Sequence, residues 1–150
     1  MIVSSLELNE TKARRDLIEV GKLLYNRGYI CGVEGNLSIR LSESAILTTP
    51  AGSCKGRLKE EDLVLTDFKG NPLKETDKRE TNNKVPRAST ELKMHLTVYQ
   101  QRKDTGAVVH AHPTAAVAFT VSGRGKELEK CVLPEIVCTL GSIPVAPYAT

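Results

Sequence analysis

The sequence predicts an α/β fold in which a mixed sheet is covered by helices on both faces, as in a three-layer α/β/α sandwich. Three observations support this prediction. Apolar residues recur at helical spacing in several stretches, short apolar or β-branched runs typical of strands lie between those stretches, and glycine and proline mark their boundaries. The 150 residues, of which 40% are hydrophobic, are enough for one domain with a substantial core.

The first helix is expected from about Asn9 to Asn26, with Asn9 as its N-cap. Gly28 follows as a natural C-terminal stop. The apolar residues of this stretch recur every three or four positions and predict one buried stripe: Ala13, Leu17, Val20 and Leu24.

Short strands are predicted next, over residues 37–41, 45–49 and 63–66. The segment Asp67–Pro72 contains Gly, Asn and Pro and is typical of a turn. Residues 74–84 are nearly all polar or charged, and we interpret them as a surface loop without regular structure.

A second helix is expected to start near Ser89 and to carry Leu92, Leu96 and Tyr99 on one face. It leads into a buried strand over residues 107–111. A third helix should follow His112-Pro113 and end at Gly123. Two short extended segments complete the prediction, Ile136–Val137 and Ile143–Val145.

Composition excludes several classes of function. The 21 Lys and Arg against 18 Asp and Glu give a formal charge of +3, which is too mild for a nucleic-acid-binding stripe. The sequence has no apolar run of about 18 residues that would span a membrane, and Met1–Glu10 does not resemble a signal peptide. The four cysteines form no C-x-x-C pair and are expected to be reduced thiols: Cys31, Cys54, Cys131 and Cys138.

The most informative motif is His110-Ala111-His112, at the end of the predicted strand over residues 107–111. Side chains at positions i and i+2 of a strand point the same way, so the two imidazoles would converge on one spot. This is the geometry of metal ligands. Because H-x-H is short and common, two unrelated polar residues at a strand end remain the alternative.

Glu91 is the second candidate, about twenty residues before the histidine pair. A carboxylate in the first turn of a helix is stabilised by the helix dipole, which explains it without any function. Near a zinc ion, however, it could ligate the metal or act as a general base. His95 shares a helix face with Glu91, and we favour a core histidine over a ligand there.

Three further segments have anion-binding chemistry, although a plain turn or cap explains each of them taken alone. Glu34-Gly35-Asn36 is a Gly-Asn turn that enters a strand. Thr48–Gly52 is a strand end followed by a turn whose free backbone N–H groups could hold an oxyanion. Ser89 and Thr90 offer hydroxyl groups at the positive end of a helix, although Ser89 could simply be its N-cap.

Taken in order, these motifs resemble the class II aldolase/adducin head family, especially its L-fuculose-1-phosphate aldolase and related sugar-phosphate aldolases. The resemblance rests on Gly35-Asn36, Thr49–Gly52, Ser89–Glu91, His110-x-His112 and the final segment Ser142–Thr150. It implies a three-layer fold with a largely antiparallel sheet. It also implies cleavage of a ketose 1-phosphate to dihydroxyacetone phosphate and an aldehyde such as L-lactaldehyde.

The same resemblance implies a role for each matching residue. Zinc, one per subunit, would be held by Glu91, His110 and His112 together with a later histidine, and would act as a Lewis acid that stabilises the enediolate. Glu91 would also be the catalytic acid/base. The phosphate of the substrate would lie in a pocket made by Gly35, Asn36, Ala51, Gly52, Ser89 and Thr90.

The sequence departs from the family pattern in two respects. No histidine follows His112, and residues 131–140 lack a tyrosine that such an aldolase uses. We therefore expect residues 1–150 to be a single domain truncated at its C-terminus. The intact protein is expected to be a cytoplasmic homotetramer that binds a small sugar phosphate, and neither nucleic acid nor a membrane.

Three other functions stay open at this point. Two use the same fold and metal chemistry, an L-ribulose-5-phosphate 4-epimerase and a methylthioribulose-1-phosphate dehydratase. The third, an adducin-like assembly module, is not an enzyme. Such modules lack the metal ligands, whereas this sequence has Glu91, His110 and His112.

Overall fold

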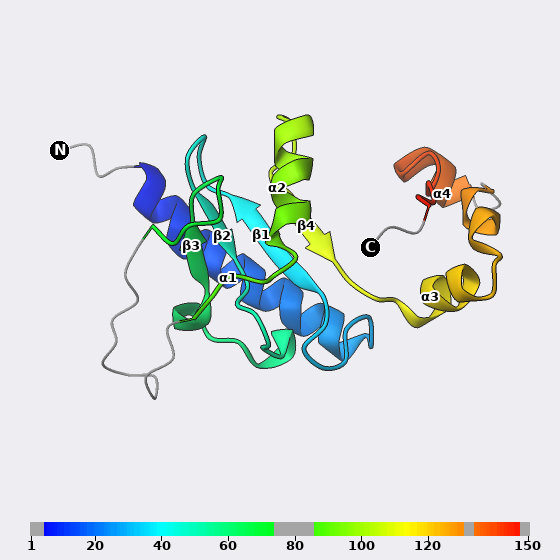
Figure 1. Ribbon diagram of the computed structural model, residues 1–150, viewed down its shortest axis with the longest axis horizontal. Helices are drawn as coiled ribbons and strands as arrows, with labels where there is room; N and C mark the ends of the chain where they lie inside the picture. Colours follow the sequence, from blue (N-terminus) through cyan, green and yellow to red (C-terminus); the bar gives the residue numbers. More distant parts are fainter. Residues whose placement is uncertain (1–4, 74–85, 131–133, 148–150) are drawn as a thin grey trace. The chain divides into compact units, whose positions relative to one another are not determined.

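The computed structural model describes residues 5–73, 86–130 and 134–147 of the chain. The chain divides into two compact units, residues 1–111 and residues 112–150. The first unit contains a four-stranded sheet (Figure 1), and the described part of the second unit is built from short helices. A single domain over residues 1–150 stays a prediction.

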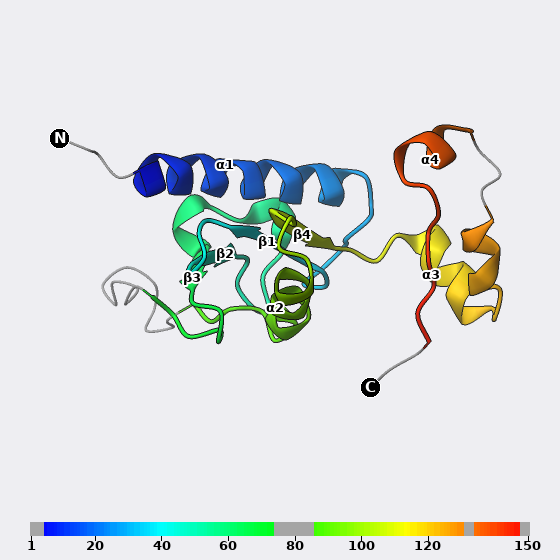
Figure 2. The same ribbon diagram turned by 90° about the horizontal axis from the view of Figure 1, so that it is seen from above.

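The sheet consists of β1 (Asn36–Arg40), β2 (Ile46–Thr48), β3 (Val64–Thr66) and β4 (Ala107–His110). Its strand order is β3-β2-β1-β4, and every neighbouring pair is antiparallel. All four strands lie where the apolar runs predict them. The α/β class is confirmed, with a helix on each face of the sheet (Figure 2).

Helix α1 spans Ser5–Asn26, so it begins four residues before the predicted start. Asn9 is therefore inside the helix, and its prediction as N-cap is wrong. The residues around Asn9 are mostly Leu and Glu, whose high helix propensity allows the helix to extend in this direction. The predicted stop is confirmed: Gly28 has φ +68°, and its N–H donates to the carbonyl oxygen of Tyr25 at 3.0 Å.

The face of the sheet toward α1 is apolar. Leu37 of β1 and Leu47 of β2 project to this face, because alternate residues of a strand point to opposite sides. They pack against the predicted stripe of α1 and against two leucines that flank the short 3₁₀ helix Glu60–Asp62. The buried members of this core are Ala13, Leu17, Leu37, Leu47, Leu58 and Leu63.

The opposite face packs against α2, which spans Leu92–Gln101. Leu92, Leu96 and Tyr99 are buried against Ile46 of β2, which confirms the predicted face of this helix. The helix begins three residues after Ser89, so Ser89 is not its N-cap. Ser89 instead caps the turn that precedes the helix: its Oγ accepts from the Glu91 N–H at 3.3 Å, and its carbonyl oxygen accepts from the Leu92 N–H at 3.0 Å.

The predicted turn after β3 is confirmed. The Asp67 carboxylate accepts hydrogen bonds from the backbone N–H groups of Lys69 and Asn71, each at 2.8 Å, and Gly70 adopts φ +85°. The polar segment predicted as a loop, residues 74–84, lies outside the described residues.

Two expectations about β4 are wrong. The strand lies at the edge of the described sheet, beside β1 only, and its side chains are exposed or half-buried rather than buried. It also ends at His110, so His112 lies beyond it. His110 pairs with Asn36, the first residue of β1, and the chain before Asn36 turns at Gly35 with φ +68°, so the partner strand does not continue beside Ala111 and His112.

In the second unit, α3 spans Thr114–Val121, as predicted, and Gly123 follows it with φ +74°. Residues 136–137 lie in a helix instead of an extended segment, since α4 spans Pro134–Thr139. Proline at the first helical position and Glu135 after it favour a helix start, which outweighs the β-branched pair. Residues 143–145 form no strand.

Two expectations from composition can be compared with the described residues. Within them, no helix has the length and apolar character needed to cross a membrane. Cys31, Cys54 and Cys138 carry free thiols, as expected for reduced cysteines. Cys131 lies outside the described residues.

Candidate active site

Four segments that are distant in sequence meet at one end of β1, and all belong to the first unit. Asn36 pairs with His110 across the β1–β4 ladder. The Leu37 N–H donates to Thr49 Oγ1 at 3.1 Å, and the Thr49 N–H donates to the Leu37 carbonyl oxygen at 3.0 Å. The sheet therefore brings the Gly35-Asn36 turn beside both the strand end at Thr49 and the end of β4.

The fourth segment is joined to the strand end by backbone pairing. Pro50 and Ala88 form an antiparallel bridge, and the Ala51 N–H donates to the Arg87 carbonyl oxygen at 2.8 Å. This bridge places Ser89, Thr90 and Glu91 beside the turn at Ala51. It also uses the N–H of Ala51, so the prediction that this turn leaves its N–H groups free is wrong for that residue.

Gly35 is required by packing against the backbone. Its φ is +68°, and a Cβ there would lie 2.7 Å from the His110 carbonyl oxygen and 2.8 Å from Ile30 Cγ2. The close approach that favours glycine is thus to β4, and we predicted an approach to a ligand. Gly52, with φ +64°, has nothing within 4 Å of such a Cβ.

The centre of the site is a cluster of Asn36, Glu91 and His110. The Glu91 Oε2 atom lies 3.4 Å from His110 Nδ1, and the Asn36 amide donates to the same carboxylate oxygen. The Asn36 Nδ2 atom is 3.3 Å from His110 Nδ1. Glu91 precedes the first residue of α2, and its side chain is 47% exposed, so the carboxylate is held by a buried amide yet reachable from solvent.

Asn36 contributes a buried oxygen atom, Oδ1, that could accept a hydrogen bond from a ligand or bind a metal ion. The residue is 1% exposed, and its Oδ1 atom has no hydrogen-bond partner in the part of the chain that the structure describes. A buried carbonyl oxygen without a partner costs free energy, so such an atom is uncommon unless something else satisfies it. This unpartnered atom lies in a residue whose amide nitrogen contacts both Glu91 and His110.

A second polar network lies under this cluster, on the α2 face of β1. The Ser38 hydroxyl is 2.7 Å from His95 Nδ1 and 2.8 Å from the Tyr99 hydroxyl. His95 is fully buried, which agrees with the interpretation as a core histidine. Burial lowers the pKa of His95 to about 4, and His110 acts in the same direction while Glu91 opposes it.

Two of the three predicted metal ligands, Glu91 and His110, are brought together. Carboxylate and imidazole are typical zinc ligands, and a tetrahedral site needs four. His112 belongs to the second unit. Among the described residues, no three His, Cys, Asp or Glu side chains form a group that could hold a metal ion. The Glu91 carboxylate and the His110 imidazole of the first unit thus fit zinc as two of the four ligands that it needs.

Of the predicted phosphate-binding residues, Ser89 and Thr90 line a pocket of about 430 Å³. Arg87, Lys69 and Lys93 also line it, so it is basic, although Gly35, Asn36, Ala51 and Gly52 are not among its lining residues. Backbone pairing brings the three segments that contain the six predicted residues to the same end of β1.

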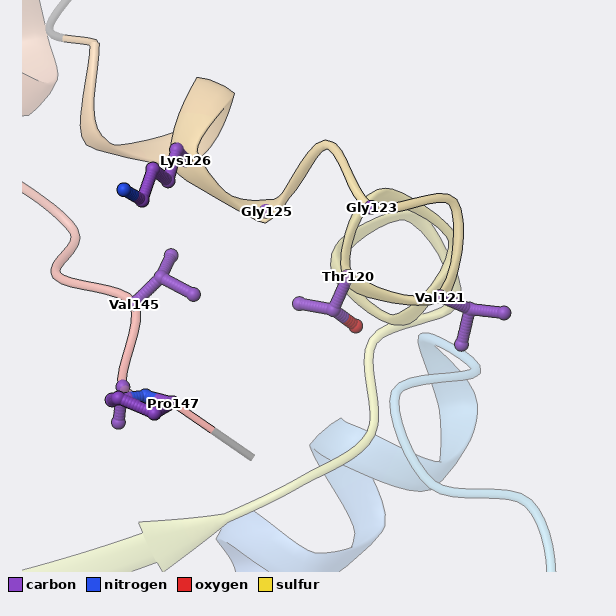
Figure 3. A pocket seen from close by; sticks show the side chains of 8 residues that line it. Thr120, Val121, Gly123, Gly125, Lys126, Val145 and Pro147 are labelled. Atoms are coloured by element: carbon purple, nitrogen blue, oxygen red, sulfur yellow. The ribbon is translucent and has the colours of Figure 1, made fainter. Parts of the chain in front are cut away.

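The second unit has a separate pocket of about 660 Å³ (Figure 3). Thr120 and Val145 extend toward the space between them, with Gly123, Gly125 and Lys126 along one wall. No residue that the sequence predicts for the site lies in this pocket.

Sequence reasoning missed two residues near the site. Ser38 is the inner contact of His95, and Lys55 is a buried ammonium group whose pKa is lowered by desolvation. For Ser38 a signal existed, since a hydroxyl two residues after Asn36 in a strand shares its face. For Lys55 there was none, because a lysine in a turn is normally exposed.

Comparison with known proteins adds the family. The model of the Class II Aldolase and Adducin N-terminal domain matches residues 15–150. A 3-oxo-tetronate 4-phosphate decarboxylase of Pectobacterium atrosepticum is 30% identical over 143 residues, which cover 93% of the chain and 61% of that protein. An L-fuculose phosphate aldolase of Methanococcus maripaludis is 36% identical over 133 residues, which cover 89% of the chain and 65% of that protein.

A solved structure has the same fold. The crystal structure of YgbL from Klebsiella pneumoniae matches with a TM-score of 0.77 and 28% sequence identity. The match covers 94% of this chain and 64% of that one. The chain thus spans somewhat less than two thirds of the length of these similar proteins.

Proposed function

Because the chain belongs to the class II aldolase and adducin N-terminal domain family, we propose that it acts as a zinc-dependent sugar-phosphate aldolase. The reaction is cleavage of a ketose 1-phosphate, such as L-fuculose 1-phosphate, to dihydroxyacetone phosphate and an aldehyde. The observation that carries this proposal is the cluster of Asn36, Glu91 and His110, in which a buried amide and an imidazole converge on one reachable carboxylate.

Glu91 is the acid/base of this proposal. Retro-aldol cleavage removes a proton from the hydroxyl group of the aldehyde fragment and returns one to the carbon of the ketose fragment. A positioned carboxylate can perform such proton transfers. The hydrogen bond from Asn36 fixes the orientation of the Glu91 carboxylate, and the exposure of that carboxylate leaves room for a substrate beside it.

Glu91 and His110 are also the residues of the first unit that would hold zinc, and His112 would join them. A bound zinc ion supplies Lewis-acid polarisation of the carbonyl and hydroxyl oxygens of the substrate. The phosphate pocket would use Gly35, Asn36, Ala51, Gly52, Ser89 and Thr90. The basic side chains around Ser89 and Thr90 support an anionic substrate.

A second candidate is favoured by the similarity to 3-oxo-tetronate 4-phosphate decarboxylase. Loss of carbon dioxide from a 3-oxo acid and retro-aldol cleavage both break a carbon–carbon bond beside a polarised carbonyl group. The same cluster could therefore serve either reaction. The two differ in the group that leaves, which is carbon dioxide in one reaction and an aldehyde in the other.

A substrate panel tests the proposal. The protein is supplied with zinc and incubated separately with L-fuculose 1-phosphate, 3-oxo-tetronate 4-phosphate, L-ribulose 5-phosphate and methylthioribulose 1-phosphate. We expect dihydroxyacetone phosphate from the first substrate. Carbon dioxide from the second would select the decarboxylase, and conversion of the third or fourth alone would select the epimerase or the dehydratase.

Metal content separates an enzyme from an assembly module. We expect one zinc ion per subunit after supplementation, in a cytoplasmic protein that is a homotetramer. A protein without stoichiometric metal and without activity on any of the four substrates would instead support an adducin-like role. Light scattering coupled to size exclusion gives the number of subunits.

A further inference from the structure

Lys55 is a buried lysine that donates hydrogen bonds to two backbone carbonyl oxygens. The residue is 2% exposed, and its Nζ atom donates to the carbonyl oxygen of Val33 at 2.6 Å and to that of Ser53 at 2.9 Å. Lysine is almost never fully buried without partners, because desolvation of an ammonium group is costly. Burial lowers its pKa accordingly, while Glu34, Cys54 and Glu91 act in the opposite direction.

The two carbonyl groups belong to two different loops of the proposed site. Val33 lies two residues before Gly35, and Ser53 follows Gly52 directly. The ammonium group of Lys55 therefore ties together the two glycine-containing turns that the proposed phosphate pocket uses. Its charge also acts on Glu91, since the attraction to that carboxylate is one of the causes that raise the pKa of Lys55.

Close packing fixes the backbone from which this side chain extends. Lys55 begins the 3₁₀ helix Lys55–Arg57, which packs against α1. A Cβ at Gly21 of α1 would lie 2.6 Å from the Lys55 carbonyl oxygen, and one at Gly56 would overlap the Tyr25 ring. Two glycines thus allow α1 and the 3₁₀ helix to approach closely, and this contact limits movement of Lys55 away from the loops.

We propose that Lys55 is a positioning residue for the anion site: it holds the 33–36 and 50–53 segments at a fixed separation and adds a buried positive charge near the substrate phosphate. The inference rests on the proposed function, because it presumes that these segments bind phosphate. The inference goes beyond the proposed function because it names one buried side chain, that of Lys55, as the group that holds the loops of the pocket in place.

The test compares Lys55→Met with Lys59→Met. Methionine keeps much of the volume of lysine but has neither its charge nor its donors, and Lys59 is an exposed matched control whose side chain is 74% exposed. Two measurements are made on each protein. Hydrogen exchange reports the protection of backbone amides in residues 31–36 and 50–54, and calorimetry reports the affinity for inorganic phosphate.

We expect faster exchange in both segments of Lys55→Met, no such change in Lys59→Met, and a loss of phosphate affinity of about tenfold or more in Lys55→Met only. A tenfold loss equals about 1.4 kcal/mol of binding free energy. Unchanged exchange in Lys55→Met would overturn the inference. So would faster exchange combined with the phosphate affinity of the wild type.

Lys55→Arg covers the possibility that Lys55→Met does not fold. Arginine keeps the charge and the donors, so the exchange pattern and most of the phosphate affinity should survive. If Lys55→Arg folds and its loops stay protected, but it loses as much phosphate affinity as Lys55→Met, the positioning role of Lys55 would be contradicted.

The outcomes also separate this inference from the proposed function. Wild-type protein that binds phosphate but cleaves none of the four substrates refutes the aldolase and leaves the role of Lys55 supported. Wild-type protein that cleaves L-fuculose 1-phosphate, with kcat and KM unchanged in Lys55→Met, supports the aldolase and refutes the role of Lys55. Wild-type protein that does not bind phosphate at all refutes the role of Lys55.

Discussion

The two faces of the sheet in the first unit differ in what they bury. Toward α1, Leu37 and Leu47 of the sheet bury an apolar cluster with Ala13 and Leu17 of the helix. Toward α2, the apolar residues Ile46, Leu96 and Tyr99 are joined by buried polar ones, of which Asn36, Ser38 and His95 are nearest the site. Strand β1 contributes to both faces, because Leu37 and Ser38 are neighbours that point in opposite directions.

The comparison shows that one face of β1 contributes to stability and the other face contributes residues to the proposed active site. Burial of apolar surface on the α1 face is favourable by about 25 cal/mol per Å². On the α2 face, each buried polar group needs partners, and two of them, Asn36 Oδ1 and His95 Nε2, have none within the described residues. The α2 face therefore gives up stability where the proposed active site lies, which is common for functional sites.

The largest expected effect comes from His110→Ala. It removes an imidazole that contacts Glu91 and that we propose as a zinc ligand. Bound zinc and measurable cleavage should both be lost. Because the side chain is only 24% exposed, its removal should also lower the free energy of unfolding, by about 1 kcal/mol. Metal analysis and a dihydroxyacetone phosphate assay check this. Val109→Ala, at a 53% exposed position of the same strand, should retain both metal and activity.

The α1 face should respond in the opposite way. Leu47→Ala deletes a fully buried side chain of this face and should lower the free energy of unfolding by about 2–5 kcal/mol. The folded fraction should keep its turnover per active site. Urea unfolding and active-site titration measure the two effects. The same substitution at the 52% exposed Leu23 should cost less than about 0.5 kcal/mol.

Acidification should lower the stability of the protein through His95, which is buried on the α2 face of the sheet. Its pKa is about 4 in the folded protein and near 6.5 when unfolded, so the unfolded chain binds more protons between these values. Stability should therefore fall as the pH drops from 6.5 to 4, by about 3 kcal/mol in total. His95→Gln cannot take up this proton. The free energy of unfolding of His95→Gln should therefore change less between pH 6.5 and pH 4 than that of the wild type. If it falls as steeply as in the wild type, His95 is not the source of the pH dependence.

The sequence predicts the apolar face well and the polar face only in part. Helical spacing identified Ala13 and Leu17 of α1, and strand patterning located all four strands to within one residue. These predictions work because burial of apolar surface is reflected directly in residue type and spacing.

The errors arose where backbone pairing decides the outcome. Ser89 has the residue type of an N-cap, but it caps a turn that precedes α2, and the Pro50–Ala88 bridge that fixes the position of this segment is encoded by no local pattern. Strand β4 ends at His110, so the two-residue spacing of the histidines does not by itself align their rings. The convergence of Glu91 with Asn36 and His110 likewise depends on contacts between residues more than 50 positions apart.

The smallest of these effects is the most specific to the chemistry of the polar face. Glu91→Gln keeps an oxygen that can accept the hydrogen bond from Asn36, so the fold and substrate binding should persist, but an amide cannot take up a proton at neutral pH. Turnover should fall by about 10²-fold or more, because that is the usual contribution of a positioned acid or base. Steady-state kinetics should place the loss in kcat and leave KM nearly unchanged.

The control is Glu43→Gln, at an exposed position in the turn between β1 and β2, which should have wild-type kcat. If the Glu91→Gln protein also turned over at the wild-type rate, Glu91 would only shape the site, and proton transfer on this face would belong to another group.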